Sequence, residues 1–127
     1  EDDLKYPNFN IKYNDRIKNI MESLPDDYDI IYFGRCWDKC SKNISLNSYL
    51  VKCYIPQCRH SYGVTRKGAE KIINYTRNLL KPGDYTISRL IKKGVIIAYG
   101  SKPSIFIQNR ERLGSNLGNR YIQKECV

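Results

Sequence analysis

The stretch Asp29-Ile30-Ile31-Tyr32-Phe33-Gly34 gives the first indication of the fold. Isoleucine and aromatic residues are enriched in strands, and a short apolar run without a polar face is typical of a strand buried on both sides. The run is therefore predicted to be a buried strand that ends at Gly34. The polar residues that follow, 35–48, are predicted to form a loop.

A helix is predicted on each side of this strand. Before it, residues 14–24 carry apolar side chains at helical spacing, and Asn14 is a candidate N-cap. After it, Thr65 is the predicted cap of a helix that extends to about residue 80. Gly68 lies inside that second helix, where glycine costs about 1 kcal/mol relative to alanine. A packing role is therefore expected for Gly68.

The rest of the chain continues this alternation of elements. A strand is predicted over residues 49–55, where side chains alternate in character, and further short strands are predicted over 60–64 and 95–99. A further short helix is predicted to begin at Asp84 and to stop at Gly94. Strands that alternate with helices indicate a layered α/β domain.

Length and hydropathy place the chain among folded domains. It has 127 residues, which fits a single domain, and 41% of them are hydrophobic, which argues against intrinsic disorder. No run of 18 apolar residues occurs, so no transmembrane helix is predicted. The chain opens with Glu1 instead of Met and lacks the basic start of a signal peptide. A processed product or a fragment is therefore expected.

The net charge of +9 favours an anionic partner such as a nucleic acid, a membrane surface or a phosphorylated small molecule. The abundance of Lys, Asn and Ile offers a second explanation, because A/T-rich codons encode all three. A host with an A/T-rich genome, such as a large DNA virus, would produce the same bias. A cytoplasmic or virus-associated location is predicted, and the endoplasmic reticulum lumen is left open.

Five cysteines are present, and four of them are clustered in the first half of the chain: Cys36, Cys40, Cys53 and Cys58. Four thiolates at short spacings are the ligand set of a structural zinc site, although neither pair has the usual Cys-x2-Cys spacing. One or two disulfides would form instead in an oxidising compartment. Buried thiols that pack as small apolar groups are the third possibility.

Three groups of polar residues are candidates for chemistry. Glu1-Asp2-Asp3 supplies adjacent carboxylates, which suit Mg²⁺ or Mn²⁺, unless the segment is only a frayed acidic terminus. His60, the sole histidine, precedes a predicted helix N-terminus that could hold an anion. Asp84 follows Pro82-Gly83 and is either a helix N-cap or a carboxylate placed to take a proton from an acceptor hydroxyl.

The order of these motifs resembles glycosyltransferase family 25, which holds bacterial lipopolysaccharide-core transferases and collagen hydroxylysine galactosyltransferases. The resemblance covers nearly the whole chain. Its most specific segment is His60-Ser61-Tyr62-Gly63-Val64-Thr65-Arg66-Lys67-Gly68-Ala69-Glu70-Lys71. The other matching segments are Glu1-Asp2-Asp3, the stretch from Tyr28 to Gly34, Pro82 and Asp84, Ala98-Tyr99, Pro103-Ser104, Gln108 and Ser115.

The resemblance implies a GT-A-like α/β fold, with residues 1–127 as one partial domain. The family has a nucleotide-binding region before its acidic motif, so this N-terminal part is expected to be missing. The implied activity is the inverting transfer of a hexose from a nucleotide-sugar donor, such as a UDP-sugar, to a glycan or a hydroxylated protein. The implied cofactor is Mn²⁺ or Mg²⁺, which would neutralise the diphosphate leaving group.

The resemblance also implies roles for individual residues. Asp3 and Glu1 would hold the metal, Asp2 would lie near the ribose or the metal, and Asp84 would act as the base or bind the acceptor. The positions expected around the donor or acceptor pocket are His60, Gln108 and Ser115. Asn116 follows Ser115 where the family often has aspartate, which weakens the role of that position.

Three other functions are kept as alternatives. A basic nucleic-acid-binding module would use the positive charge and the 11 tyrosines. The basic residues are scattered along the chain, however, so no nucleic-acid partner is expected. A non-catalytic fragment of a transferase and a zinc-stabilised structural domain are the other two alternatives.

Overall fold

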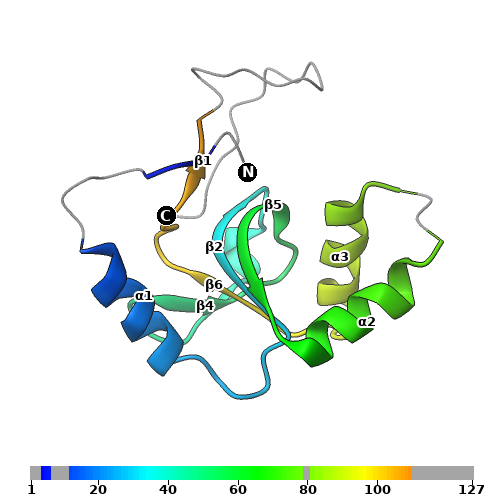
Figure 1. The fold of residues 1–127 in the computed structure, drawn as a ribbon, viewed down its shortest axis with the longest axis horizontal. Helices are drawn as coiled ribbons and strands as arrows, with labels where there is room; N and C mark the ends of the chain where they lie inside the picture. The colour runs from blue at the N-terminus through cyan, green and yellow to red at the C-terminus, as the bar shows by residue number, and fades with distance from the viewer. Residues whose placement is uncertain (1–3, 7–11, 79–80, 110–127) are drawn as a thin grey trace.

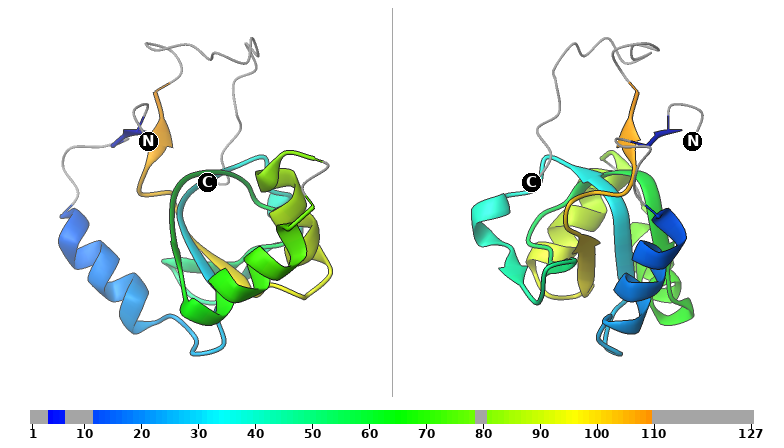
Figure 2. Two further views of the ribbon diagram at one scale, coloured as in Figure 1. Left: turned by 45° about the vertical axis from the view of Figure 1, so that its right-hand side comes forward. Right: turned by 90° about the vertical axis from the view of Figure 1, so that its left-hand side faces the viewer.

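The computed structural model describes residues 4–6, 12–78 and 81–109. These residues form a mixed α/β fold, in which helix α1 lies on one side of a five-stranded sheet and helices α2 and α3 lie on the other (Figures 1 and 2). The elements are β1 (Leu4–Lys5), α1 (Tyr13–Glu22), β2 (Ile30–Cys36), the 3-10 helix η1 (Cys40–Lys42), β3 (Ile44–Ser45), β4 (Leu50–Lys52), β5 (Gln57–Val64), α2 (Arg66–Thr76), α3 (Gly83–Lys92), β6 (Ala98–Ser101) and β7 (Ile107–Gln108). The predicted α/β class is confirmed at this level.

The sheet has the strand order β3-β4-β6-β2-β5, so the predicted buried strand is flanked on both sides. β2 pairs in parallel with β6, with Ile30 opposite Ala98, and antiparallel with β5, with Ile30 opposite Val64. Six of the seven residues of β2 are buried, which is the pattern of a strand covered on both faces. A separate two-stranded sheet joins β1 to β7.

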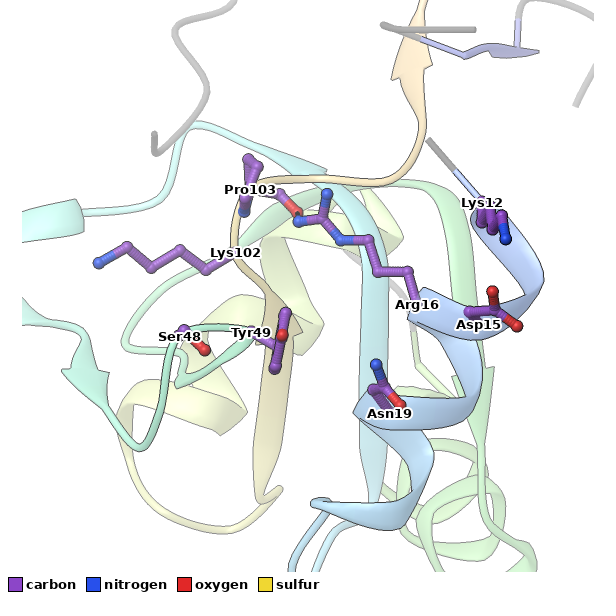
Figure 3. Close-up of a pocket in the computed structure, with 8 residues that line it drawn as sticks. All are labelled: Lys12, Asp15, Arg16, Asn19, Ser48, Tyr49, Lys102 and Pro103. Carbon is purple, nitrogen blue, oxygen red and sulfur yellow. Dashed lines mark hydrogen bonds between the residues drawn. The ribbon is translucent and has the colours of Figure 1, made fainter. Parts of the chain in front are cut away.

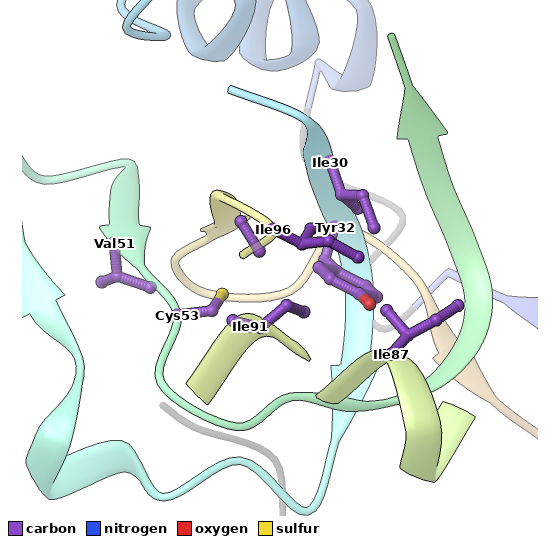
Figure 4. Packing of buried hydrophobic residues seen from close by; sticks show 8 residues of the cluster. Ile30, Tyr32, Val51, Cys53, Ile87, Ile91 and Ile96 are labelled. Carbon is purple, nitrogen blue, oxygen red and sulfur yellow. The ribbon is translucent and has the colours of Figure 1, made fainter. Parts of the chain in front are cut away.

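Alternate residues of β2 contribute to two cores. Ile30 and Tyr32 face α3 and pack with the other buried residues of that side, which are Val51, Cys53, Ile87, Ile91, Ile96 and Ala98 (Figure 4). Ile31 faces α1 and packs with Ile20, Leu50, Tyr99 and Ile105. This alternation follows from the two-residue period of a strand, which sends successive side chains to opposite faces.

Asp29 joins the start of β2 to α2 and to the segment before β6. Its side chain is fully buried and pairs with Lys71 Nζ at 2.5 Å, while the backbone N–H of Ile97 donates to the same carboxylate at 2.9 Å. The Asp29 carbonyl accepts from the Thr65 N–H at 3.0 Å. Thr65, Gly68 and Lys71 therefore all pack around Asp29.

The predicted start of α2 is confirmed in detail. Thr65 is the N-cap, and its side chain accepts from the backbone N–H of Gly68 at 3.0 Å. The expected packing role of Gly68 is also confirmed, because a Cβ at this position would overlap the carbonyl group of Asp29. Alanine at residue 68 would therefore push α2 away from β2.

The predicted end of the central strand at Gly34 is wrong, because β2 continues to Cys36. Gly34 lies at a register shift between β2 and β5, and a Cβ there would overlap the His60 ring and the Phe106 carbonyl. Glycine is needed for this close approach and does not break the strand. Residues 35–48 are accordingly not one loop, because they also contain η1 and β3.

Other boundaries shift by a few residues. Helix α1 covers Tyr13–Glu22, close to the predicted 14–24, but Asn14 lies inside it and is not its N-cap. The strands predicted at 49–55, 60–64 and 95–99 are observed as β4, β5 and β6, with the bounds given above. Helix α3 ends at Lys92, and Gly94 follows with a φ of 73°, as expected for a glycine that terminates a helix. No helix within the described residues is long and apolar enough to cross a membrane.

Candidate functional site

The carboxyl ends of the parallel strands β2 and β6 meet at one edge of the sheet, which we call the carboxyl edge. Ligands of open α/β sheets bind outside the carboxyl ends of parallel strands. Helices α1 and α3 run in the opposite direction to these strands, so both begin toward this edge (Figure 1). The chain leaves β6 at the same edge and continues into β7. Sequence position alone does not reveal this convergence.

Asp84 lies at this edge, in the first turn of α3. The predicted N-cap role of Asp84 is wrong, because Pro82 occupies the cap position and Asp84 is the second helical residue. Its Oδ1 accepts from the N–H of Tyr85 at 2.8 Å, and the side chain is half-buried. A carboxylate in the first turn is stabilised by the helix dipole. Asp84 is thus held in place and remains accessible.

Arg59 is a further candidate residue near Asp84. The sequence gives no indication that the two residues lie close together. A Cβ on Gly83 would lie 2.9 Å from Arg59 Nη2, so the exposed guanidinium of β5 lies against the first turn of α3. This positive group stands beside the residue that precedes Asp84. The sequence signal for it was the pair Arg59-His60, but the contact with α3 depends on how α3 packs on β5.

His60 is buried, with 5% of its surface exposed, and it joins β5 to the segment before β7. Its ring Nε2 lies 3.2 Å from the Phe106 carbonyl oxygen. Because a carbonyl oxygen only accepts, this geometry assigns a proton to Nε2. The ring also packs directly on Gly34. Because Nε2 is hydrogen-bonded to a backbone carbonyl, His60 is suited to hold residues 106–108 in position.

Gln108 lies opposite Leu4 in the β1–β7 pair, and Lys5 lies opposite Ile107. Leu4, which pairs with Gln108, directly follows the acidic triplet in sequence. The triplet Glu1-Asp2-Asp3 and Ser115 lie outside the described residues. Their predicted roles as metal and pocket residues therefore stay predictions.

A buried ion pair supports the end of β2 on the α3 side. Arg35 Nε and Asp38 Oδ2 are 3.1 Å apart, and both side chains are 1% exposed. Asp38 also accepts from Asn43 Nδ2 at 2.7 Å and from the Ile55 N–H at 3.1 Å, while Arg35 Nη1 donates to the Ser101 carbonyl at 2.7 Å. The network holds together a segment that was predicted to be a loop.

The cysteine alternatives are resolved in part. Cys36 and Cys58 form a disulfide with a Cα–Cα distance of 5.5 Å, Cys40 is also disulfide-bonded, and Cys53 is a buried free thiol. A four-thiolate zinc site is therefore not formed. Among the described residues, no group of three or more His, Cys, Asp or Glu side chains could hold a metal ion.

Burial changes the acid–base behaviour of two groups near this network. Removal from water raises the pKa of the Cys53 thiol to about 12, with Arg35 lowering it and Asp38 raising it. Burial likewise raises the pKa of Tyr32 above its usual range. Both groups therefore remain protonated near neutral pH and are poor candidates for nucleophiles.

Cys53 is expected to resist alkylation in the folded protein, because the thiolate is the reactive form and the side chain is buried. Peptide mapping by mass spectrometry after iodoacetamide treatment measures this residue separately from other cysteines. The same treatment in denaturant is the control and should label Cys53 fully. Equal labelling rates in the two conditions would contradict the prediction.

Because the pKa of Cys53 in the folded protein exceeds the ordinary value of 9.0, the contribution of this thiol to stability is lost as the pH rises from 9 toward 12.

A pocket of about 370 Å³ opens on the α1 side of the carboxyl edge (Figure 3). It is lined by Lys12, Asp15, Arg16, Asn19, Ser48, Tyr49, Lys102 and Pro103. None of these residues was a candidate from sequence. They come from three separate segments, so only the folded chain brings them together.

Comparisons of the chain with protein-family models, with curated proteins and with solved structures give no match.

Proposed function

We propose that this chain is a glycosyltransferase domain that transfers a hexose from a nucleotide-sugar donor, such as a UDP-sugar, to a hydroxyl group of a glycan or a protein. The proposal starts from the family resemblance of the motif order. The observation that supports it most is the position of Asp84, which lies half-buried in the first turn of α3 at the carboxyl edge, with Oδ1 accepting from the Tyr85 N–H.

The acceptor side of the reaction requires a group that removes a proton from the attacking hydroxyl. Asp84 is the proposed base, because it is half-buried at the edge and anchored through one oxygen to its own helix. Arg59 beside Gly83 would offer positive charge to an anionic group close by. His60 would act indirectly, since it holds the Phe106 carbonyl and thereby the segment that carries Gln108.

The donor side requires charge neutralisation at the diphosphate. Described residues form no complete metal-binding group, so a divalent ion would depend on Glu1 and Asp3, with Asp2 beside them. The pairing of Leu4 with Gln108 supports a position of this end of the chain near the other candidates. When bound, Mn²⁺ or Mg²⁺ would supply Lewis-acid stabilisation of the leaving diphosphate.

The direct test of the donor site is a calorimetric titration of UDP into the protein with and without Mn²⁺. UDP binding is expected to require Mn²⁺, and Asp3→Asn is expected to weaken it by about tenfold or more, because a charged ligand oxygen to the metal is lost. Asp26→Asn, which alters an exposed aspartate, is the matched control and should leave UDP binding unchanged. UDP binding that ignores both Mn²⁺ and Asp3, or no UDP binding at all, would count against the proposal.

A further inference from the structure

The pocket on the α1 side of the carboxyl edge has two walls that the backbone fixes relative to each other. One wall is the first two turns of α1, with Arg16 and Asn19, and the other comprises Tyr49 and Lys102-Pro103 (Figure 3). Arg16 Nη2 donates to the Pro103 carbonyl at 2.9 Å, which ties the two walls together. The Lys102 N–H donates to the Tyr49 carbonyl at 2.8 Å. The pocket is therefore built by the fold.

The charges around this pocket favour an anion. Three cationic side chains, Lys12, Arg16 and Lys102, line it against a single carboxylate, that of Asp15. Within the part of the chain that the structure describes, none of these four side chains forms a salt bridge. The described residues therefore leave this positive charge without a counter-ion, and a bound anion would experience a net attraction.

Arg16 is held in the wall of the pocket, because its Nη2 donates to the Pro103 carbonyl. This hydrogen bond fixes the position of the guanidinium group. Guanidinium groups pair well with phosphate oxygens, because their donors match the geometry of those oxygens.

The remaining surface of the pocket suits an organic body attached to the anion. Tyr49 is 42% exposed, and together with Pro103 and the alkyl parts of the basic side chains it provides apolar area. Asn19 and Ser48 add hydrogen-bonding groups. A volume of about 370 Å³ lies within the range of small-molecule sites.

We propose that this pocket binds a small phosphate monoester, with the phosphate at Arg16 and the organic part against Tyr49. The site is separate from the proposed transfer reaction, because it uses neither the acidic triplet nor Asp84. Binding is therefore expected without a divalent metal and is expected to be unaffected by Asp3→Asn. These two properties separate a failure of this proposal from a failure of the proposed transferase function.

The test is a calorimetric titration of the whole chain with inorganic phosphate, glucose 6-phosphate and uridine monophosphate, in the absence of divalent metal. Arg16→Gln is expected to weaken binding of all three by about tenfold, the effect of losing a charged hydrogen bond. Lys18→Gln removes the same charge from the same helix outside the pocket, at a side chain that is 72% exposed and lies 3.9 Å from Glu22. This control is expected to change affinity by less than about twofold, because exposed charges are screened.

A second variant, Tyr49→Leu, tests the organic part of the site. It should weaken binding of glucose 6-phosphate or uridine monophosphate while binding of inorganic phosphate is kept. The tighter of the two esters identifies a sugar phosphate or a nucleotide as the ligand. The proposal is overturned if phosphate does not bind at millimolar concentration, if both charge variants lose affinity equally, or if neither ester binds more tightly than inorganic phosphate.

Discussion

For the proposed transferase function, replacing Asp84 with asparagine is expected to lower the rate of hexosyl transfer by about 10²- to 10⁴-fold, the usual contribution of a general base. Asparagine has the same shape and retains Oδ1, which accepts from the Tyr85 N–H in the native protein. The start of α3 should therefore remain intact, and the loss should lie in the chemical step. Donor binding, measured by UDP titration, is expected to stay unchanged.

The measurement is the rate of UDP release in the presence of donor and acceptor, compared between the native protein and Asp84→Asn. Asp26→Asn again serves as the control, since it alters an exposed aspartate far from α3 in sequence. A variant that keeps more than about a tenth of the native rate would exclude Asp84 as the base.

Replacing Asp38 with alanine is expected to lower the free energy of unfolding by about 3–5 kcal/mol. The substitution removes the carboxylate that accepts from Arg35, Asn43 and Ile55, and it leaves the Arg35 guanidinium buried without its counter-ion. Such an uncompensated buried charge costs more than the pair itself contributes. A loss of this size is a large fraction of the stability of a domain of this length.

Equilibrium unfolding in urea measures this loss, and Asp26→Ala is the control, with an expected change within about 0.5 kcal/mol. The double variant Arg35→Met, Asp38→Ala gives a further check. It removes both charges, so it is expected to be less destabilised than the sum of the two single variants. A loss below about 1 kcal/mol in Asp38→Ala would show that Arg35 finds another partner.

Local sequence patterns were sufficient to predict those elements whose causes are local. The cap at Thr65 and the stop at Gly94 follow from propensity and short spacing, and the structure confirms both. The central strand was predicted because both of its faces are apolar. These features depend on residues within a few positions of one another.

The features that sequence reasoning missed depend on contacts between distant segments. Gly34 was predicted to end a strand, whereas it makes room for His60 and Phe106. Arg35 was placed in a loop, although it is almost fully buried against Asp38 and the Ser101 carbonyl. A motif of arginine followed three residues later by aspartate was the only local signal for that pair. The cysteine spacings fitted several pairings, and only the fold selects Cys36 with Cys58.

The candidate site likewise combines residues that local sequence patterns identify with contacts that only the fold creates. Asp84 was selected from Pro82-Gly83-Asp84, and it does lie at a helix start, but its neighbour Arg59 comes from a separate strand. The pocket around Arg16 and Tyr49 could not be predicted, because its walls come from segments far apart in the chain. Sequence thus identifies single residues, whereas their combination into sites requires the packing of elements.

The parallel pairing of β2 with β6 has a consequence for synthesis on the ribosome. Asp29 and Ile97, which hydrogen-bond at the start of this pair, are 68 residues apart. β2 therefore lacks its neighbour β6 until residues 98–101 have been translated, although its other neighbour, β5, is translated earlier. Contacts of such sequence separation slow folding and leave apolar surface exposed in nascent chains. Truncation before β6 should produce chains that depend on chaperones.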